Sequence, residues 1–388
     1  MYFNWPARRD TVKISDVKTF LADPGYRKNL CFVKVETTDG IHGWGECYTQ
    51  SDRDVQIAAN VGQLRRYLVG RDPSRIKEFT QFAYDDFAAR RGSMDLYCAV
   101  SGIEQALWDI KGKALGAPVH ALLGGACRDR VRVYANGWSH GGNSPEEMSD
   151  SAKQIVEMGF TAIKFDPIPG PWRTFIDRQT ERRAVQNVRA VREAVGPDID
   201  LLIEIHRRLA PMHAVRLARE IEEFEPFWFE EPVLAENIDA LAEAKHQIQI
   251  PVVTGEELYT KFEFREVFEK RAADIINPDV GSVGGILELK EIAAMAEAYL
   301  VAVAPHNYNS TTVALAATIQ ISACIPNFLI TEFFVPMQAF GLQVARPPFE
   351  VEDGFISVPE RPGLGIDLDE DALAQAPYRE FPVRRSAW

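Results

Sequence analysis

Short apolar runs recur along the chain from about residue 131, and each is followed by a longer stretch in which apolar positions have helical spacing. The runs are β-branched and apolar throughout, which is typical of parallel strands buried on both faces. The stretches between them carry apolar residues at i, i+3 and i+4, the spacing of an amphipathic helix. The eight runs cover residues 131–136, 161–166, 201–206, 227–232, 250–257, 273–279, 300–306 and 328–334.

Eight successive strand–helix units predict a (β/α)8 barrel of the TIM type. The competing arrangement is an open, doubly wound sheet, but such a sheet rarely contains eight units. It also favours a glycine-rich first turn, and the chain has no GxGxxG motif. We therefore predict an α/β protein whose (β/α)-barrel domain covers residues 126–340.

The chain on either side of the barrel has a different pattern. Residues 28–46 predict a β-hairpin around an Asp39-Gly40 turn, and two helical patterns follow it. Residues 1–125 are therefore expected to form an N-terminal α+β capping domain. Residues 341–388 alternate short strands and turns. Because they have no apolar core of their own, we expect this C-terminal segment to pack on the capping domain and complete it.

Composition narrows the classes of partner. The 388 residues include 43 Lys and Arg against 56 Asp and Glu, a formal net charge of −13. Nucleic acids and anionic membranes bind clustered positive charge, so neither is expected as a partner. The most apolar stretch, residues 314–330, is broken by Gln320 and Pro326 and predicts a buried helix and strand instead of a membrane span.

Cysteine usage indicates a cellular location. The five cysteines are scattered without a CxxC motif, and the first ten residues contain no apolar signal segment. Both observations favour a cytoplasmic protein with reduced thiols over a secreted one with disulfides.

Titratable side chains close seven of the eight predicted strands. The carboxyl ends of the strands form the active site of a parallel barrel. A single charged strand end is explained by exposure at the surface, but that explanation predicts scattered Lys, Ser, Thr and Asn. Here the strand ends carry mostly carboxylates and imidazoles: Lys164, Asp166, Glu204, His206, Glu230, Glu231, Glu256, Glu257, Asp279, His306 and Glu332.

Three of these carboxylates form a candidate metal site. Glu204, Glu230 and Glu256 lie 26 residues apart on adjacent strands. Three carboxylates close together cannot all stay ionised without a cation. Oxygen ligands suit a hard divalent ion, and Mg²⁺ keeps positions open for substrate oxygens. We therefore predict one Mg²⁺ per active site.

Two further pairs suggest acid–base chemistry. Asp279 and His306 end neighbouring strands, and a carboxylate beside an imidazole fixes its tautomer and raises its basicity. The pair is interpreted as a general base, although His306 alone would also fit a hydrogen-bonded core histidine. Lys164 and His206 belong to strands on the opposite side of the barrel. Alternation along a strand predicts that His206 and Glu204 point to one face.

These residues together resemble the mandelate racemase subgroup of the enolase superfamily. The resemblance covers nearly the whole chain, including TTDGIHGWGE, SGIEQALWDIKGKALGAPVHALLGG, the EEP and GEE strand ends, and NPDVGSVGG before APHN. It implies that the metal is bound by Glu204, Glu230 and Glu256. It also implies that Lys164 and the metal hold a substrate carboxylate and stabilise the enediolate that forms when the α-proton leaves.

The strand ends also differ from those of the racemases, which carry Lys-x-Lys where this chain has Lys164-Phe165-Asp166. Asp166 is expected to pair with Lys164 or to bind substrate. The acid-x-His pair Glu204 and His206 is similar to galactonate dehydratase and related sugar-acid dehydratases, in which the histidine is the general acid. Their first metal ligand is usually Asp, whereas here it is Glu204.

The resemblance therefore implies a hydro-lyase that converts an aldonate to a 2-keto-3-deoxy acid. His306, oriented by Asp279, would remove the C2 proton, and His206 would protonate the departing 3-hydroxyl. Glu332 would hydrogen-bond the enolate oxygen or the substrate. The first alternative is a racemase, epimerase or cycloisomerase that acts on a sugar acid or lactone through the same enediolate. The second is a non-catalytic barrel that binds sugar acids.

Two arginines and the loops at the barrel mouth are the remaining candidates for substrate contacts. Arg207 and Arg208 either reach a distal substrate carboxylate or pair with nearby acids. The family forms homo-oligomers, so a dimer or octamer is expected. Loops of the capping domain and the first barrel loop are expected at the barrel mouth, and the residues expected to contact the sugar acid are Asp166, Tyr26, Tyr48, Trp138 and His140.

Overall fold

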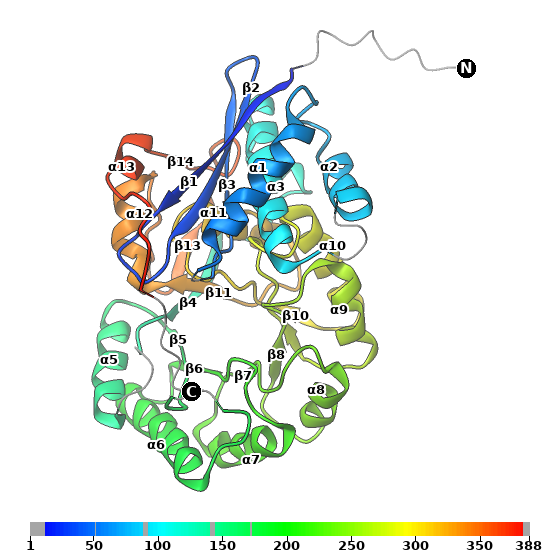
Figure 1. Cartoon of the computed structure of the whole chain (residues 1–388). Helices are drawn as coiled ribbons and strands as arrows, with labels where there is room; N and C mark the ends of the chain where they lie inside the picture. Colours follow the sequence, from blue (N-terminus) through cyan, green and yellow to red (C-terminus); the bar gives the residue numbers. More distant parts are fainter. Residues whose placement is uncertain (1–11, 51, 88–91, 140–143, 171–172, 383–388) are drawn as a thin grey trace.

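Eight parallel strands form the predicted barrel (Figure 1). The computed structural model describes residues 12–50, 52–87, 92–139, 144–170 and 173–382. The strands pair in the order β10-β9-β8-β7-β6-β5-β4-β11, and a parallel bridge between Val303 and Phe328 closes the ring. The strands are β4 Arg130–Asn136, β5 Ala162–Phe165, β6 Asp200–Glu204, β7 Trp228–Glu230, β8 Val252–Thr254, β9 Ile275–Ile276, β10 Ala302–Val303 and β11 Thr331–Phe334.

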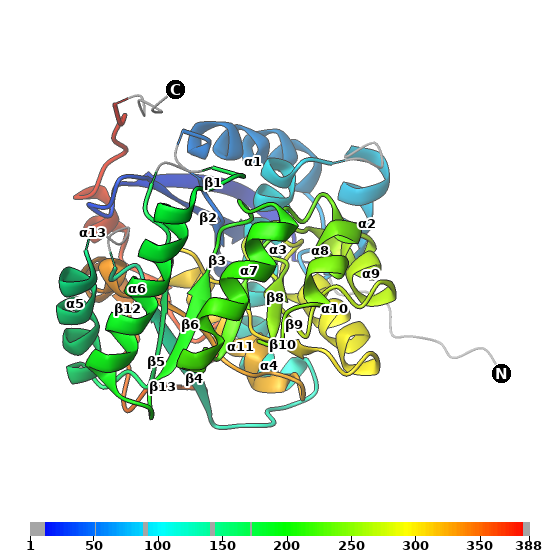
Figure 2. The same ribbon diagram turned by 90° about the horizontal axis from the view of Figure 1, so that it is seen from below.

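Helices surround the barrel and cover its strands, and α5 to α8 pack side by side on the outside (Figure 2). Helix α5 is capped at its N-terminus by the Ser144 hydroxyl, which accepts the backbone N–H of Glu147 at 3.2 Å. Helix α11 is buried on all sides, since it contacts β4 of the barrel and β3 of the capping domain. The helices are α5 Pro145–Glu157, α6 Arg178–Val195, α7 Pro211–Ile221 with the 3₁₀ turn η2 Glu222–Phe224, α8 Ile238–Lys245, α9 Thr260–Glu269, α10 Ile286–Ala298 and α11 Val313–Cys324.

The capping domain is a three-stranded antiparallel sheet covered by helices. The predicted hairpin is present as β2 and β3, and β1, which the hairpin pattern did not include, pairs with β2. Gly43 and Gly45 let β3 approach α3 backbone to backbone, because a Cβ at either position would overlap a carbonyl oxygen of α3. The elements are β1 Ile14–Ala22, β2 Leu30–Thr37, β3 His42–Cys47, α1 Asp54–Leu68, α2 Ile76–Phe82, the π-helical turn η1 Ala83–Phe87, α3 Met94–Leu115 and α4 Val119–Leu122.

No helix in these described ranges is both long and apolar enough to cross a membrane.

The C-terminal segment contacts both preceding parts of the chain. Strand β13 pairs antiparallel with β4 of the barrel. On the capping domain, the Asp367 carboxylate accepts the indole N–H of Trp44 at 2.5 Å and pairs with Lys113 at 3.4 Å. The segment contains two helices where only strands and turns were expected. The elements from residue 335 onward are η3 Val335–Met337, α12 Gln338–Val344, β12 Ala345–Arg346, β13 Phe355–Ser357, β14 Asp367–Leu368 and α13 Glu370–Ala374. The domain boundaries near residues 125 and 340 stay a prediction.

Candidate active site

Three glutamates meet at the carboxyl ends of adjacent barrel strands. Glu204 ends β6, Glu230 ends β7, and Glu256 follows β8. One carboxylate oxygen of each lies within 4.8 Å of those of the other two, and all three side chains are buried. Burial and the nearby Glu204 carboxylate raise the pKa of Glu230 well above its usual range. In the described part of the chain, Glu230 Oε2 also has no hydrogen-bond partner, so this oxygen is available to coordinate a cation.

Lys164 extends from the end of β5 into this cluster and is 1% exposed. Its Nζ lies 2.7 Å from Glu230 Oε1, 3.3 Å from Glu204 Oε2 and 3.9 Å from Glu332 Oε2. The Asn136 side-chain amide donates to the Glu332 carboxylate. The ammonium thus offsets part of the negative charge that three to four buried carboxylates bring together.

Asp279 and His306 form a buried pair just beyond the ends of β9 and β10, where a parallel bridge joins the two residues. His306 Nδ1 lies 2.7 Å from Asp279 Oδ2, which places a proton on Nδ1 and leaves Nε2 as the atom that can accept one. Nε2 lies 3.3 Å from Glu256 Oε2 and 3.5 Å from Glu332 Oε2. Burial alone would lower the pKa of His306, but these carboxylates raise it to about 9.

The second glutamate of each Glu-Glu pair contacts a neighbouring strand end. Glu231 has a positive φ of 46°, and its carboxylate accepts the backbone N–H of Gly255 at 2.7 Å. Burial raises the pKa of Glu231 to about 8. Glu257 lies 3.2 Å from Arg207, which also pairs with Glu256. Of the two roles considered for Arg207, pairing with nearby acids is therefore the one observed.

His206 and Asp166 form a second imidazole–carboxylate pair. His206 Nδ1 lies 3.0 Å from Asp166 Oδ2, and Arg208 pairs with the other oxygen of Asp166. Burial would lower the pKa of His206, but Glu204 and Asp166 raise it. The expected pairing of Asp166 with Lys164 is wrong, because Lys164 turns toward the glutamates instead. Asp166 stays a predicted substrate contact.

His206 lies beyond the end of β6, so the prediction that strand alternation sets its direction is wrong. Strand β6 ends at Glu204, and His206 and Arg207 have positive φ values of 54° and 62°. The backbone N–H of His206 instead donates to Glu204 Oε1 at 2.7 Å. This turn, and not strand periodicity, brings His206 next to the glutamate cluster, and about 35% of its side chain stays exposed.

Aromatic residues of the capping domain and of two barrel loops cover the rim. The Tyr48 ring lies 6.0 Å from the His306 ring, and Tyr26 lies edge-on to Phe334 at 5.3 Å. Trp138 is buried against Phe165 at 5.5 Å. His140, also predicted as a substrate contact, lies outside the described residues. The roles of these side chains as substrate contacts stay predictions.

Lys28 and Tyr308, which the sequence pattern did not single out, also lie at this rim. The Lys28 ammonium donates to the carbonyl of Thr49 at 2.7 Å and lies 4.6 Å from the centre of the Tyr308 ring. That ring stacks 6.0 Å from His306. Burial lowers the pKa of Lys28 to about 8. In the sequence, Lys28 is the first residue of the predicted hairpin and shows no sign of burial, so only the fold reveals that it is buried.

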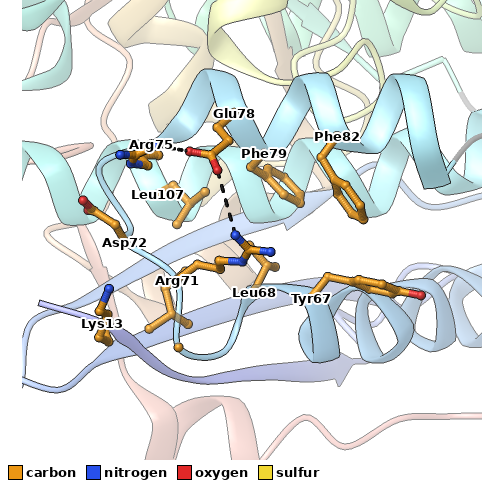
Figure 3. Close-up of a pocket in the computed structure, with 12 residues that line it drawn as sticks. Lys13, Tyr67, Leu68, Arg71, Asp72, Arg75, Glu78, Phe79, Phe82 and Leu107 are labelled. Atoms are coloured by element: carbon orange, nitrogen blue, oxygen red, sulfur yellow. Dashed lines mark hydrogen bonds and ion pairs between the residues drawn. The ribbon is translucent and has the colours of Figure 1, made fainter. Parts of the chain in front are cut away.

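A separate groove of about 550 Å³ lies on the capping domain, between β1, α1 and α2 (Figure 3). Its floor is apolar, with Leu68, Phe79 and Leu107. The Glu78 carboxylate at its rim lies 2.7 Å from Arg75. The groove has no counterpart of the carboxylate cluster, and the barrel mouth is the stronger candidate for chemistry.

Comparison with known proteins assigns the family. The model described as "Mandelate racemase / muconate lactonizing enzyme, N-terminal domain" matches residues 21–124, and the one described as "Enolase C-terminal domain-like" matches residues 147–372. The chain belongs to the mandelate racemase subgroup of the enolase superfamily. The resemblance of its strand ends to this subgroup is therefore confirmed.

Relatives within the superfamily are similar over most of their length. A D-galactonate dehydratase from Variovorax paradoxus is 36% identical, with 97% of each chain covered. A D-gluconate dehydratase from Thermoproteus tenax is 36% identical, with 90% of this chain and 70% of that one covered. The crystal structure of a putative dehydratase from Mesorhizobium loti has a TM-score of 0.89 and 36% identity, with 95% of this chain and 99% of that one covered. The predicted barrel with its capping domain is confirmed by this similarity.

Proposed function

We propose that this enolase-superfamily protein is a Mg²⁺-dependent sugar-acid dehydratase, a hydro-lyase that forms a 2-keto-3-deoxy acid. The observation that carries the proposal is the pair of histidines on opposite sides of one carboxylate cluster. His306 follows the seventh strand of the barrel and His206 the third, so they are half a turn apart around the ring. A base and an acid on opposite sides of a substrate suit an elimination. The dehydratase relatives support the same activity.

Glu204, Glu230 and Glu256 fit a divalent metal ion. All three offer oxygen ligands within 4.8 Å of one another, and one oxygen of Glu230 lacks a partner in the described ranges. When bound there, Mg²⁺ would supply a Lewis acid for the substrate carboxylate and 2-hydroxyl. Superfamily membership supports Mg²⁺ over other divalent ions. The binding of Mg²⁺ by these three residues is part of the proposal.

The remaining residues move protons and hold charge. A cation bound beside Glu256 would lower the pKa of His306 from about 9 and leave Nε2 free to act as a base. His306 Nε2 then takes the C2 proton, while the Asp279 carboxylate holds the Nδ1 proton and stabilises the imidazolium. The ammonium of Lys164 faces the negative charge that develops on the substrate carboxylate. Glu332, buried beside Lys164 and His306, borders the same charge.

His206 completes the elimination. Glu204 and Asp166 raise the pKa of His206 and so favour the protonated imidazole that a general acid requires. It gives this proton to the 3-hydroxyl as the C3–O bond breaks, and water leaves. The resulting enol takes a proton at C3 and becomes the 2-keto-3-deoxy acid. The exposed third of the His206 side chain gives it access to substrate.

A sugar-acid library incubated with Mg²⁺ tests the proposal, with 2-keto acid detected by semicarbazide. Loss of one water from at least one aldonate is expected. His206→Asn should lose dehydration but retain exchange of the C2 hydrogen in deuterated water, whereas His306→Asn should lose both. A product of unchanged mass would instead show an epimerase, racemase or cycloisomerase. Absence of both dehydration and exchange across the library would show a non-catalytic barrel.

The substrate is proposed only as a class, an aldonate with a 2-hydroxyl and a 3-hydroxyl. A homo-oligomeric state, dimer or octamer, and a cytoplasmic location stay predictions. Two relatives are named D-galactonate dehydratase and D-gluconate dehydratase, so sugar acids with a single carboxylate are the first choice for the library.

A further inference from the structure

Residues 280–287 run from Asp279 into the first turn of helix α10. They are hydrogen-bonded to helix α3 of the capping domain. Gln105 donates to the carbonyl of Val280 at 3.2 Å, and the N–H of Gly284 donates to Ser101 Oγ at 2.9 Å. The N–H groups of Ile286 and Leu287 donate to the two Glu104 oxygens at 2.7 and 3.0 Å. Three neighbouring side chains of one helix thus hold a barrel segment along its length.

Glu104 is central to this contact. It is fully buried and also accepts the indole N–H of Trp108 at 2.7 Å. Its carboxylate satisfies two of the N–H groups that are left unpaired at the start of α10, where the helix dipole favours a negative charge. Gly285 has a positive φ of 95°, and a Cβ there would overlap Glu104. Backbone and side chain are therefore fitted to each other.

The same segment fixes Asp279. The N–H of Gly281 donates to Asp279 Oδ1 at 2.7 Å, which leaves Oδ2 for His306 Nδ1 at 2.7 Å. The Gly281 carbonyl in turn accepts the N–H of Tyr48 at 3.0 Å. A Cβ on Gly281 would lie 2.9 Å from that Tyr48 nitrogen and 3.1 Å from Asp279 Oδ1. A shift of residues 280–287 would therefore rotate the carboxylate that orients His306.

We propose that Ser101, Glu104 and Gln105 are positioning residues of the Asp279–His306 base, acting from the capping domain through residues 280–287. The inference rests on the proposed function for its kinetic consequence. None of the three side chains carries a proton for the reaction. Their effect is to hold His306 Nε2 where it meets the C2 hydrogen, since misplacement of about 1 Å costs about a hundredfold in rate.

Helix α3 also provides a matched control. Asp109 is another buried carboxylate on the same helix, but it accepts the N–H groups of Leu364 at 2.9 Å and Trp44 at 3.0 Å and pairs with Lys113 at 2.8 Å. It joins the capping domain to the C-terminal segment and has no bond to residues 280–287 among the described contacts. Asp109→Asn therefore perturbs the same helix without the proposed connection.

Amide hydrogen exchange tests the contact without any substrate. Burial raises the pKa of Glu104 to about 7, so the experiment is done at pH 8, where the carboxylate is ionised. The backbone amides of residues 281–287 should exchange at least about tenfold faster in Glu104→Gln than in wild type. Asp109→Asn should leave these amides unchanged and accelerate those near Leu364. Equal exchange of residues 281–287 in Glu104→Gln and wild type would overturn the proposal, whether or not a sugar acid is turned over.

Kinetics on an aldonate that wild type dehydrates then tests the positioning. Glu104→Gln should lower kcat about ten- to hundredfold, change KM less than about twofold, and raise the isotope effect of C2-deuterated substrate, because proton removal becomes slower. Asp109→Asn should keep the wild-type isotope effect. A fall in kcat that only matches the folded fraction, with an unchanged isotope effect, would show a structural role and refute the inference.

If Glu104→Gln does not fold, Ser101→Ala replaces it, because this change removes only the bond to Gly284. The same direction of change in exchange and isotope effect is expected, and no change in either would refute the inference. If wild type dehydrates no sugar acid, the proposed function fails, and the exchange experiment still decides whether the contact exists.

Discussion

Replacing Lys164 by methionine should lower the stability of the metal-free protein and raise its affinity for Mg²⁺. The ammonium lies 2.7 Å from Glu230 and 3.3 Å from Glu204, two of the three proposed metal ligands. Lysine and metal therefore neutralise the same carboxylates and also repel each other. Removing one partner of a buried ion pair costs about 3 to 5 kcal/mol. For a chain of 388 residues this corresponds to a fall in Tm of about 4 to 6 °C in EDTA.

Lys164→Met should have the opposite, favourable effect on the binding of Mg²⁺. Unit charges about 4 Å apart interact by about 4 kcal/mol at an effective dielectric constant near 20, so the loss of the ammonium favours a divalent cation. We expect at least about tenfold tighter Mg²⁺ binding, or about 1.4 kcal/mol, by isothermal titration at pH 8. The gain should grow as pH rises, because burial and Glu204 raise the pKa of Glu230 and a proton on this carboxylate competes with the metal ion.

The control is Lys113→Met, which breaks the 2.8 Å pair with buried Asp109 in the capping domain. It should lower Tm in EDTA and leave Mg²⁺ affinity unchanged. If Lys164→Met and wild type bind Mg²⁺ with equal affinity and gain equally in Tm, lysine and metal do not share these carboxylates, and the assigned metal site is wrong.

Three further outcomes are expected. In metal-free protein the His306 imidazole should titrate near pH 9 by NMR and at lower pH with Mg²⁺, because the cation offsets Glu256; an unchanged value would place the metal elsewhere. For Glu104, burial raises the pKa from 4.5 to about 7, so the folded state binds more protons in that window and this group's contribution to stability falls as pH rises; Glu104→Gln should lack this slope in urea unfolding, and an identical slope would contradict it. Gly45→Ala should cost about 1 to 3 kcal/mol by overlap with α3, whereas Gly62→Ala, with open space around it, should be neutral or stabilising.

Hydrophobic periodicity was enough to predict the barrel and the convergence of its strand ends. Each strand is buried by helices, so its apolar run is long, and the first polar residue after it marks the rim. Glu204 and Glu230 follow from this rule alone, whereas Glu256 lies two residues beyond Thr254, the first polar residue of its strand. The rule stops where a strand stops: His206 lies in a turn with positive φ, and its position depends on hydrogen bonds that periodicity does not encode.

Partners across the rim could not be predicted from the sequence. Asp166 pairs with His206 and Arg208 because Lys164 is drawn to a larger negative charge, which depends on distances between strands. The sequence around Lys28 gives no sign that its side chain is buried, and it becomes buried only because it packs over Tyr308. The two short helices of the C-terminal segment were missed for a similar reason, since segments of five and seven residues carry little periodic signal.

The C-terminal segment has a consequence for the order of folding during synthesis. The capping domain leaves the ribosome before the barrel. Yet its Trp44 is hydrogen-bonded to Asp367 and its Asn29 to Arg379, and both partners are made more than 300 residues later. Strand β13 likewise reaches back to β4. Such contacts of long sequence separation form late and leave early segments unpartnered. The nascent capping domain is therefore open to aggregation and proteolysis until residues 367–379 have been made and can pack on it.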